Sequence, residues 1–553
     1  MKLFLNTLFG ILLSVNISFA QFEKPSKSVS KTEHFITNPI LKGFYPDPSI
    51  CRVKDDYYIV NSSFEYFPGI PIFHSKDLAN WEQIGYVLNR PEQLDLDSIR
   101  VSGGVYAPTI RFHNDTFYVI NTLIGKGAKG GNYYVYATNP AGPWSNPIWL
   151  KDAPGIDPSL FFDNDEKVYC CGNGRPADNT PDSKKRHIWV QELDLKTQKL
   201  VGEKSIILVG GAMVDAANAE SPHIYKKGIY YYLMIAEGGT GDNHAVTIFR
   251  SKNIRGPYEA NRKNPILTHR NLGRNYPIAC TGHADLFDTQ NGKWWMVLLG
   301  VRPYGGFHYN LGRETFIAPV IWEDGWPIVC PNEGKVLFKY PQTELNYSPV
   351  AQQTEKDDFN ADNLSYKWNF LRTPRKNFWS LKERKGFLRL HLLPDEITEL
   401  VSPAFIGRRQ EDTSFSASVN MSFVPKNDSE SAGLVLFMNK DYQFRFEKTS
   451  KSSISYLTVT RRYDGIDSIL ASMKYDGNKV ILGVCAHGQN YGFKYSSDNI
   501  NWKVISDKVD GRTLSRTNAG GFTGAYIGLY ATSKNQQSNN FADFDWFTYK
   551  GEE

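Results

Sequence analysis

The sequence has few cysteines, and their spacing holds no recognisable metal site. Only six of its 553 residues are cysteine, and no two of them form a Cys-x-x-Cys pair, which argues against a structural zinc site. Cys51, Cys170 and Cys171 fall within predicted strands, where a free thiol behaves as a small apolar side chain. We therefore expect buried free thiols, and the sequence assigns no disulfide.

Long apolar runs and blocks of charge are also missing. Lys+Arg 63 against Asp+Glu 58 leave a formal net charge of +5 that is spread along the chain, which argues against nucleic-acid binding. The one apolar stretch near the start, Leu3–Ile17, follows Lys2 and precedes a Ser-Phe-Ala motif that ends at Ala20. This pattern predicts a signal peptide at residues 1–20. The alternative is an uncleaved anchor. We expect an exported protein, periplasmic or extracellular, that is free of the membrane after cleavage.

No long amphipathic helix is evident, and five similar stretches dominate instead. Each has a short polar head, a short apolar strand, a turn with Asn, Asp or Gly, and a strand rich in aromatic and β-branched residues. The heads lie at Asp47, Ala107, Asp157, Ser221 and His283. Self-similarity at this period, with short aromatic strands, is typical of a β-propeller. The pattern predicts five blades over residues 36–340.

A different pattern begins after the propeller. Residues 341–356 are polar and lack a period, as in a linker. From Asp357 onward, alternating strands are separated by turn residues at regular spacing. That arrangement is typical of an antiparallel β-sandwich, which we expect at residues 357–553. The chain is thus expected to be all-β, with two domains.

Three of the five heads carry a carboxylate at the aligned position or one residue before it, namely Asp47, Asp157 and Glu220. A propeller gathers the starts of its innermost strands around a central channel, so these acids should converge. Convergent acids suit hydrolysis of a glycosidic bond. One protonates the leaving oxygen, a second acts on water or the anomeric carbon, and a third orients the sugar and raises the pKa of the first. Turn capping by Asp-Pro and calcium binding are the alternatives.

Other residues on the predicted rim have two interpretations each. His283 is either a satisfied core histidine or a polar contact to water or a metal. Arg302 forms either a surface ion pair or a contact to sugar hydroxyls or a carboxylate. An apolar platform for a sugar could be formed by Phe64, Tyr66, Phe67 and Tyr106. Each of them could equally belong to the blade core, and this alternative is stronger for Phe67.

These residues carry a resemblance to glycoside hydrolase family 43, the β-xylosidases and α-L-arabinofuranosidases. The chain looks most like the two-domain members with a C-terminal, concanavalin-like sandwich. The matching stretches begin at Gly43 (Gly-Phe-Tyr-Pro-Asp-Pro-Ser-Ile), Ser102 (Ser-Gly-Gly-Val-Tyr-Ala-Pro), Gly155 (Gly-Ile-Asp-Pro-Ser-Leu-Phe), Ala219 (Ala-Glu-Ser-Pro-His-Ile-Tyr), Thr281 (Thr-Gly-His-Ala-Asp) and Leu311 (Leu-Gly-Arg-Glu-Thr-Phe).

The resemblance implies an inverting mechanism with defined roles for the three acids. Asp47 would be the general base that activates water, and Glu220 the general acid. Asp157 would orient the substrate and modulate the pKa of the acid. Inversion also implies carboxyl groups about 6.5–9.5 Å apart for the base and the acid.

The same resemblance assigns secondary roles around the pocket. Arg302 would contact the sugar, Phe64 would line the first subsite, and Phe522 of the sandwich would help to close it. His283 would lie near a water molecule or calcium ion in the channel. The sequence departs from many β-xylosidases of this type at Tyr106, where they carry Trp, and this leaves the preferred pentose open.

We therefore expect an exported, exo-acting, inverting glycoside hydrolase that releases pentoses from xylan-type or arabinose-containing oligosaccharides. β-Xylosidase is the leading activity, and α-L-arabinofuranosidase or a dual activity is the close alternative. No cofactor is expected beyond a structural calcium ion in the channel. The rival from another class is a non-catalytic carbohydrate-binding propeller. Clustered, mutually repelling carboxylates argue against that rival. The sequence does not give the oligomeric state.

Overall fold

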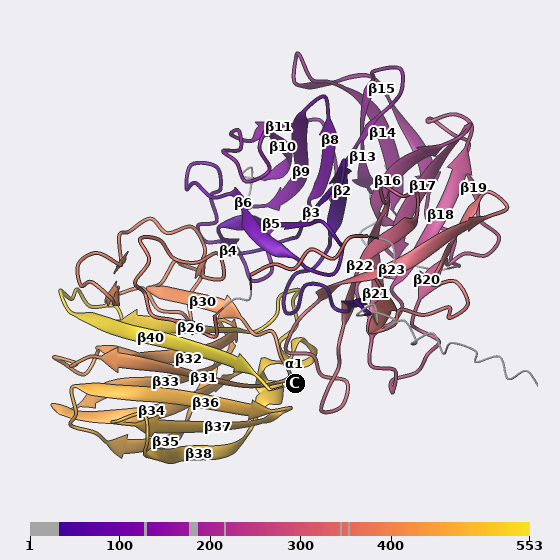
Figure 1. The fold of residues 1–553 in the computed structure, drawn as a ribbon. Helices are drawn as coiled ribbons and strands as arrows, with labels where there is room; N and C mark the ends of the chain where they lie inside the picture. The colour runs from indigo at the N-terminus through magenta and orange to yellow at the C-terminus, as the bar shows by residue number, and fades with distance from the viewer. Residues whose placement is uncertain are drawn as a thin grey trace, which may run out of the picture.

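A computed structural model describes residues 33–125, 130–175, 186–214, 217–342, 345–351 and 354–552. The predicted signal peptide lies outside these residues. The described chain is built almost entirely of strands, in a five-bladed propeller and a two-sheet sandwich that lie side by side (Figure 1). The predicted fold class is confirmed. Neither described helix has the length or the apolar character needed to cross a membrane.

Each blade is an antiparallel sheet built around four main strands. Blade one contains β2 (Ser49–Val53), β3 (Asp56–Val60), β5 (Gly69–Ser75) and β6 (Glu82–Leu88). Blade two contains β7 (Gly104–Val105), β8 (Thr109–His113), β9 (Thr116–Ile124), β10 (Gly131–Ala137) and β11 (Ile148–Trp149). Blade three contains β12 (Ser159–Phe162), β13 (Val168–Gly174), β14 (His187–Asp194) and β15 (Lys199–Val209).

Blade four contains β16 (Glu220–Lys227), β17 (Tyr230–Glu237), β18 (Ala245–Ser251), β19 (Glu259–Ala260) and β20 (Leu267–Thr268). Blade five contains β21 (Ala279–Asp288), β22 (Trp294–Val301), β23 (Glu314–Glu323) and β24 (Trp326–Val329). The first strands of the blades, β2, β8, β12, β16 and β21, contact one another around the ring. The polar heads of the repeats lie at or just before these strands, so the repeat pattern itself brings them to the central channel.

The N-terminal segment is fastened to the last blade. Strand β1 (Phe35–Thr37) pairs with β25 (Lys339–Pro341). The Asn38 side chain donates to the carbonyls of Ile317 and Leu337, 2.8 Å each, and accepts from the Ile317 amide at 2.9 Å. Because Asn38 is buried and all three hydrogen bonds join distant parts of the chain, this contact holds the ring closed.

The sandwich consists of two eight-stranded sheets. One contains β26 (Lys356–Asp357), β28 (Trp379–Ser380), β29 (Leu388–His391), β31 (Ser414–Ser422), β36 (Lys479–His487), β37 (Asn490–Ser496), β38 (Trp502–Asp510) and β40 (Phe541–Gly551). The other contains β4 (Tyr66–Phe67), β27 (Asn369–Leu371), β30 (Phe405–Arg409), β32 (Ser431–Asn439), β33 (Tyr442–Lys451), β34 (Ile454–Tyr463), β35 (Ile466–Lys474) and β39 (Tyr526–Thr532). A 3-10 helix, η1 (Gly511–Leu514), and the single-turn α1 (Arg516–Ala519) precede β39.

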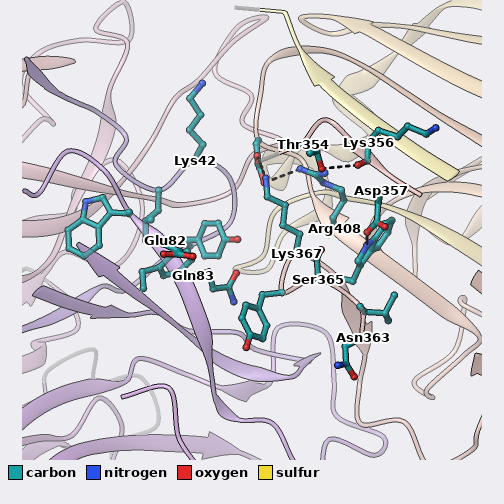
Figure 2. Close-up of a pocket in the computed structure, with 18 of the residues that line it drawn as sticks. Lys42, Glu82, Gln83, Thr354, Lys356, Asp357, Asn363, Ser365, Lys367 and Arg408 are labelled. Atoms are coloured by element: carbon teal, nitrogen blue, oxygen red, sulfur yellow. Dashed lines mark hydrogen bonds and ion pairs between the residues drawn. The ribbon is translucent and has the colours of Figure 1, made fainter. Parts of the chain in front are cut away.

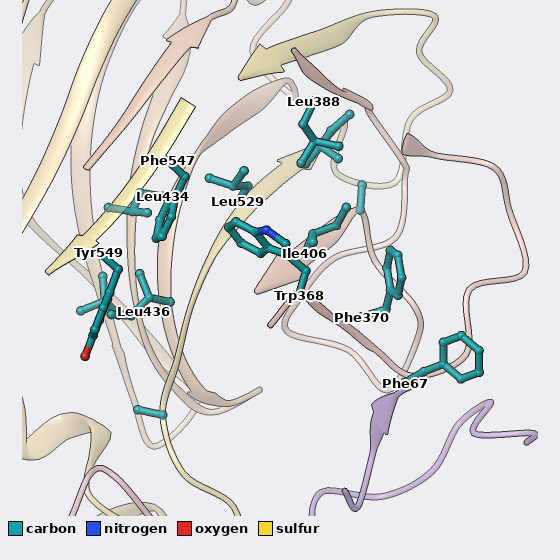
Figure 3. Close-up of a cluster of buried hydrophobic side chains, with 14 of the residues drawn as sticks. Phe67, Trp368, Phe370, Leu388, Ile406, Leu434, Leu436, Leu529, Phe547 and Tyr549 are labelled. Carbon is teal, nitrogen blue, oxygen red and sulfur yellow. The ribbon is translucent and has the colours of Figure 1, made fainter. Parts of the chain in front are cut away.

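Phe67 joins the two domains. It lies in β4, between two strands of blade one, but pairs with Phe370 of β27 at the edge of a sandwich sheet. Its ring is buried, and Figure 3 shows it beside Phe370 and Trp368 in the apolar cluster that continues into the sandwich. Phe67 does belong to a buried core that contains blade residues, as expected, and this core continues into the sandwich. The sequence did not predict the pairing of β4 with a segment about 300 residues away, because such pairing has no local signature.

Candidate active site

Four of the five repeat heads share one uncommon backbone conformation. Asp47, Asp157, Ser221 and His283 have φ values of 53°, 54°, 52° and 46°. This left-handed region is costly for residues other than glycine and occurs preferentially at functional sites. The shared geometry shows that the repeats align in space as they do in sequence. Glu220 precedes Ser221 at the start of β16, so all three predicted acids lie at the channel end of inner strands.

Asp47 is buried and held by a cation. Arg313 donates from Nη1 to Asp47 Oδ1 at 2.6 Å and from Nη2 to Oδ2 at 3.4 Å. The Ser62 hydroxyl donates to Oδ2 at 2.6 Å, and His283 Nδ1 lies 3.8 Å from Oδ1. Burial by itself would raise the pKa of Asp47, but Arg313, His283 and the Ser62 hydrogen bond lower it below its usual value. Asp47 is therefore a carboxylate at neutral pH.

Glu220 and Asp157 behave in the opposite way. Burial, followed by the charge of Asp47, raises the pKa of Glu220 to about 7, against the opposing effects of Arg313 and Arg186. Burial, then the charges of Glu220 and Asp47, raise the pKa of Asp157 well above its usual value. The two carboxyl groups titrate as a coupled pair. Both carboxyl groups therefore hold a proton more readily than a free carboxyl group does, whereas Asp47 is ionised.

Glu220 also lines a small cavity of about 230 Å³. The cavity is bordered by Asn173, Arg175, Arg186 and Asn218. The larger cavity of about 1040 Å³, shown in Figure 2, lies elsewhere, between blade one and the sandwich. Its lining contains none of the three predicted acids, and charged side chains of both signs, such as Lys367 and Glu411, face it. Of the three acids, Glu220 alone lines the smaller cavity, and Asp47 and Asp157 line neither of the two.

An aromatic wall stands beside Asp47 and comes from both domains. The ring centroids of Phe64 and Tyr106 are 5.2 Å apart, and Phe522 of the sandwich lies 5.9 Å from Phe64. The Arg313 guanidinium lies 5.5 Å from the Phe64 ring and 5.6 Å from the Phe522 ring. The Phe522 amide donates to the Ser102 hydroxyl at 2.8 Å. Two predicted platform residues, Phe64 and Tyr106, and the predicted wall residue Phe522 are thus brought together next to the ionised acid.

Arg313 is the arginine that pairs with Asp47, whereas the predicted Arg302 pairs with another carboxylate. Arg302 donates to Glu314 from Nε at 2.7 Å and from Nη2 at 2.9 Å, and to the Glu411 carbonyl at 3.2 Å. This pair is buried, so it is the predicted contact to a carboxylate and not a surface ion pair. The contact of Arg302 with a sugar stays a prediction. The sequence assigned no role to Arg313, although its Leu-Gly-Arg-Glu motif is one of the matching stretches. The signal for it was its position immediately before β23, two strands after the strand of the fifth head.

His283 is buried beside Asp47, and burial lowers its pKa below the usual value. Among the residues that the structure describes, no group of three or more His, Cys, Asp or Glu side chains is arranged to hold a metal ion. All six cysteines are free, and five of them are buried.

The family model for glycosyl hydrolases family 43 matches residues 36–327, which span the propeller and the three acids. The chain belongs to glycoside hydrolase family 43. A second model, for the β-xylosidase C-terminal concanavalin A-like domain, matches residues 356–550. The sandwich is thus the C-terminal domain of the two-domain members of family 43, and the chain is a glycoside hydrolase.

Curated relatives within family 43 match nearly the whole chain. A xylosidase/arabinosidase of Butyrivibrio fibrisolvens is 44% identical over 92% of this chain and 98% of its own length. A non-reducing end α-L-arabinofuranosidase of Bacteroides ovatus is 40% identical over 95% of this chain and 96% of its own length. Among solved structures, xylan β-1,4-xylosidase of Bacillus halodurans superposes with a TM-score of 0.87 at 35% identity, covering 93% of this chain and 100% of that one.

Proposed function

We propose that this family 43 enzyme is an inverting, exo-acting β-xylosidase that releases pentose units from the ends of xylan-type oligosaccharides. The observation that carries the proposal is the split in ionisation between neighbouring acids. Asp47 is ionised beside Arg313, whereas the pKa of Glu220 is raised to about 7. Two carboxyl groups whose environments push their pKa values apart are suited to act as base and acid in one reaction.

In the proposed mechanism, Asp47 removes a proton from a water molecule as the water oxygen attacks the anomeric carbon. The Glu220 carboxyl gives its proton to the glycosidic oxygen as the bond from the anomeric carbon to that oxygen breaks. Glu220 then leaves the step ionised, with Asp47 protonated, and proton exchange with solvent resets both groups. Inversion requires that the two carboxyl groups stand about 6.5–9.5 Å apart, which leaves room for the water molecule.

Asp157 is proposed to orient the sugar and to help keep Glu220 protonated. Burial and the charges of Glu220 and Asp47 raise the pKa of Asp157. When protonated, its carboxyl group can donate a hydrogen bond to a sugar hydroxyl, and when ionised, its charge opposes ionisation of Glu220. Arg313 and Phe64 are proposed to line the first subsite, with the sandwich residue Phe522 closing it. A wall that both domains build favours a pocket for a chain end over an open groove, which is the basis for exo action.

An α-L-arabinofuranosidase or a dual enzyme is the second candidate. It is supported by the relatives, whose names include both activities, and by Tyr106. The Tyr106 hydroxyl donates to the Ser102 carbonyl at 3.2 Å and lies 3.1 Å from Arg100 Nη2. A phenol anchored in this way presents a smaller face to the sugar than an indole does.

The proposed setting is outside the cytoplasm, periplasmic or extracellular. It is supported by the sequence pattern of residues 1–20. The proposed partner is a pentose-containing oligosaccharide or polysaccharide, without nucleic acid or membrane.

Proton NMR of anomeric signals during early turnover tests both the sugar and the mechanism. A β-xyloside and an α-L-arabinofuranoside are followed in parallel. Early appearance of the α-anomer of xylose supports an inverting β-xylosidase. Turnover of the arabinofuranoside alone would move the assignment to the second candidate. Early β-xylose would reject inversion.

A further inference from the structure

A single carboxylate, Asp285, collects hydrogen bonds at the centre of the propeller. Its Oδ2 accepts from the Ser49 hydroxyl at 2.6 Å, from the Ile50 amide at 3.2 Å and from Arg111 Nη1 at 2.9 Å. Its Oδ1 accepts from the Tyr225 hydroxyl at 2.6 Å and from Arg111 Nη2 at 3.3 Å. The Asp285 side chain is fully buried, so these donors are what compensates the charge there.

The second partner of Arg111 is a histidine. Arg111 Nη2 donates to His223 Nδ1 at 2.9 Å. Because a guanidinium can only donate, Nδ1 must accept, and the ring is neutral with its proton on Nε2. That nitrogen lies 3.5 Å from the Ser221 hydroxyl. Burial lowers the pKa of His223 to about 3, which agrees with a neutral ring.

This network connects four of the five inner strands and both proposed catalytic acids. Arg111 comes from β8, Asp285 from β21, and Ser49 opens β2, two residues after Asp47. His223 lies on β16, three residues after Glu220, where the pairing with β17 shifts register. A displacement of the guanidinium would therefore move the strands that carry the base and the acid.

We infer that Arg111 is a built-in cation that takes the place of a divalent metal ion at the propeller axis, and that the Arg111–Asp285 pair positions Asp47 and Glu220 without calcium. The inference rests on the proposed function for the roles of the two acids. It replaces the calcium expectation drawn from the family resemblance.

The chemistry of the channel supports this replacement. Calcium takes about six to eight oxygen ligands and favours carboxylates. The carboxylate at this centre already accepts five hydrogen bonds, and the guanidinium supplies one positive charge for its one negative charge. A divalent ion placed here would be repelled by the guanidinium in a medium of low polarity. The Nδ1 lone pair of His223, a further candidate ligand, is engaged by the same arginine.

The first test uses the wild-type enzyme. After dialysis against excess EDTA, kcat and the melting temperature are measured with and without added calcium, and calcium binding is measured by calorimetry. We expect no change in either quantity and no binding. A loss of kcat on chelation that calcium restores, or a calcium-dependent rise in melting temperature, would overturn the inference without touching the proposed function. An enzyme inactive on every pentoside under all conditions would instead contradict the proposed function.

The second test separates positioning from folding. For Arg111→Ala we expect kcat to fall about 10- to 100-fold, as for residues that orient catalytic groups, with a much smaller change in KM. Added guanidinium ion should restore part of kcat, and Arg111→Lys should retain more activity than the alanine variant. Wild-type kcat in a folded Arg111→Ala protein would contradict the role.

Arg52→Ala is the matched control. Arg52 also joins β2 to β21, through Asp288 at 3.2 Å, but this pair is partly exposed. We expect Arg52→Ala to change kcat little, and we expect added guanidinium ion to leave the kcat of this variant unchanged. If Arg111→Ala does not fold, the metal tests on the wild-type enzyme still decide the inference.

Discussion

Arg313 and Asp47 form a buried ion pair, with Nη1 2.6 Å from Oδ1, although 265 residues separate them in the chain. The arginine comes from the start of β23 in blade five, and the aspartate from the residues just before β2 in blade one. Ring closure brings these two blades together. The pair therefore sets both the ionisation and the direction of the proposed base, and neither residue could do this alone.

Arg313→Met is expected to move the acidic limb of the kcat/KM profile to higher pH. Burial already pushes the pKa of Asp47 upward, and Arg313 is the largest influence that lowers it. Without the guanidinium, Asp47 is protonated at a higher pH and stops acting as a base there. A pH series from acid to neutral checks this. Arg302→Met serves as control, because its partner is Glu314, and an equal shift in that variant would argue against the assignment.

Glu220→Gln is expected to discriminate between leaving groups. A saccharide leaving group needs a proton, so turnover of xylobiose should fall about 10²- to 10⁴-fold. A nitrophenyl xyloside should lose far less, because nitrophenolate departs without a proton. Glu192→Gln, an acid of blade three that pairs with Lys167, is the control and should match the wild type. Equal losses on both substrates would remove Glu220 from the acid role.

Arg186→Ala is expected to move the alkaline limb of the profile upward. Arg186 lowers the pKa of Glu220, so its removal should raise that pKa above about 7 and keep the acid protonated at higher pH. The shift should shrink as salt is added, because Arg186 is partly exposed and its field is screened. A downward shift, or none at low salt, would contradict the electrostatic account.

Arg516→Ala is expected to raise KM more than it lowers kcat. Arg516 of α1 donates to the Thr240 carbonyl at 3.0 Å and to the Tyr309 hydroxyl at 2.9 Å, and its guanidinium lies 5.7 Å from the Phe522 ring. Without these charged hydrogen bonds, the aromatic wall around Phe522 should be less rigid, and KM should rise about 10-fold. Arg512 lies four residues away and pairs with its neighbour Asp510. Arg512→Ala is therefore the control for the loss of one positive charge. An unchanged KM would show that the wall does not depend on this anchor.

Phe67→Ala is expected to destabilise both domains together. Removing a buried phenylalanine costs about 3–5 kcal/mol, and this ring belongs to the core that continues from the blades into the sandwich. Urea unfolding and scanning calorimetry are both measured. The midpoints of the propeller and sandwich transitions should decrease in parallel. Tyr136→Ala, on the exposed outer part of blade two, should cost no more than about 0.5 kcal/mol. A shift confined to one transition would show that the domains are stabilised separately.

The sequence by itself determined the repeats, and through them much of the site. Periods of alternation, turn residues and recurring heads are local features. They predicted the five blades and the sandwich, and they placed Asp47, Asp157 and Glu220 at equivalent points on the inner strands. Tyr106 immediately precedes a head, whereas the role of Phe64 came from the family resemblance.

Only the tertiary structure decided which distant side chains complete the site. Arg302 and Arg313 are both arginines beside strands of blade five, and the choice between them depends on which one reaches Asp47 and which one reaches Glu314. The docking of Phe522 against Phe64 likewise depends on how the sandwich packs on the propeller. The contacts of Arg313 with Asp47 and of Phe522 with Phe64 join residues hundreds of positions apart. Packing and charge pairing across the assembled protein select them, rather than any local pattern.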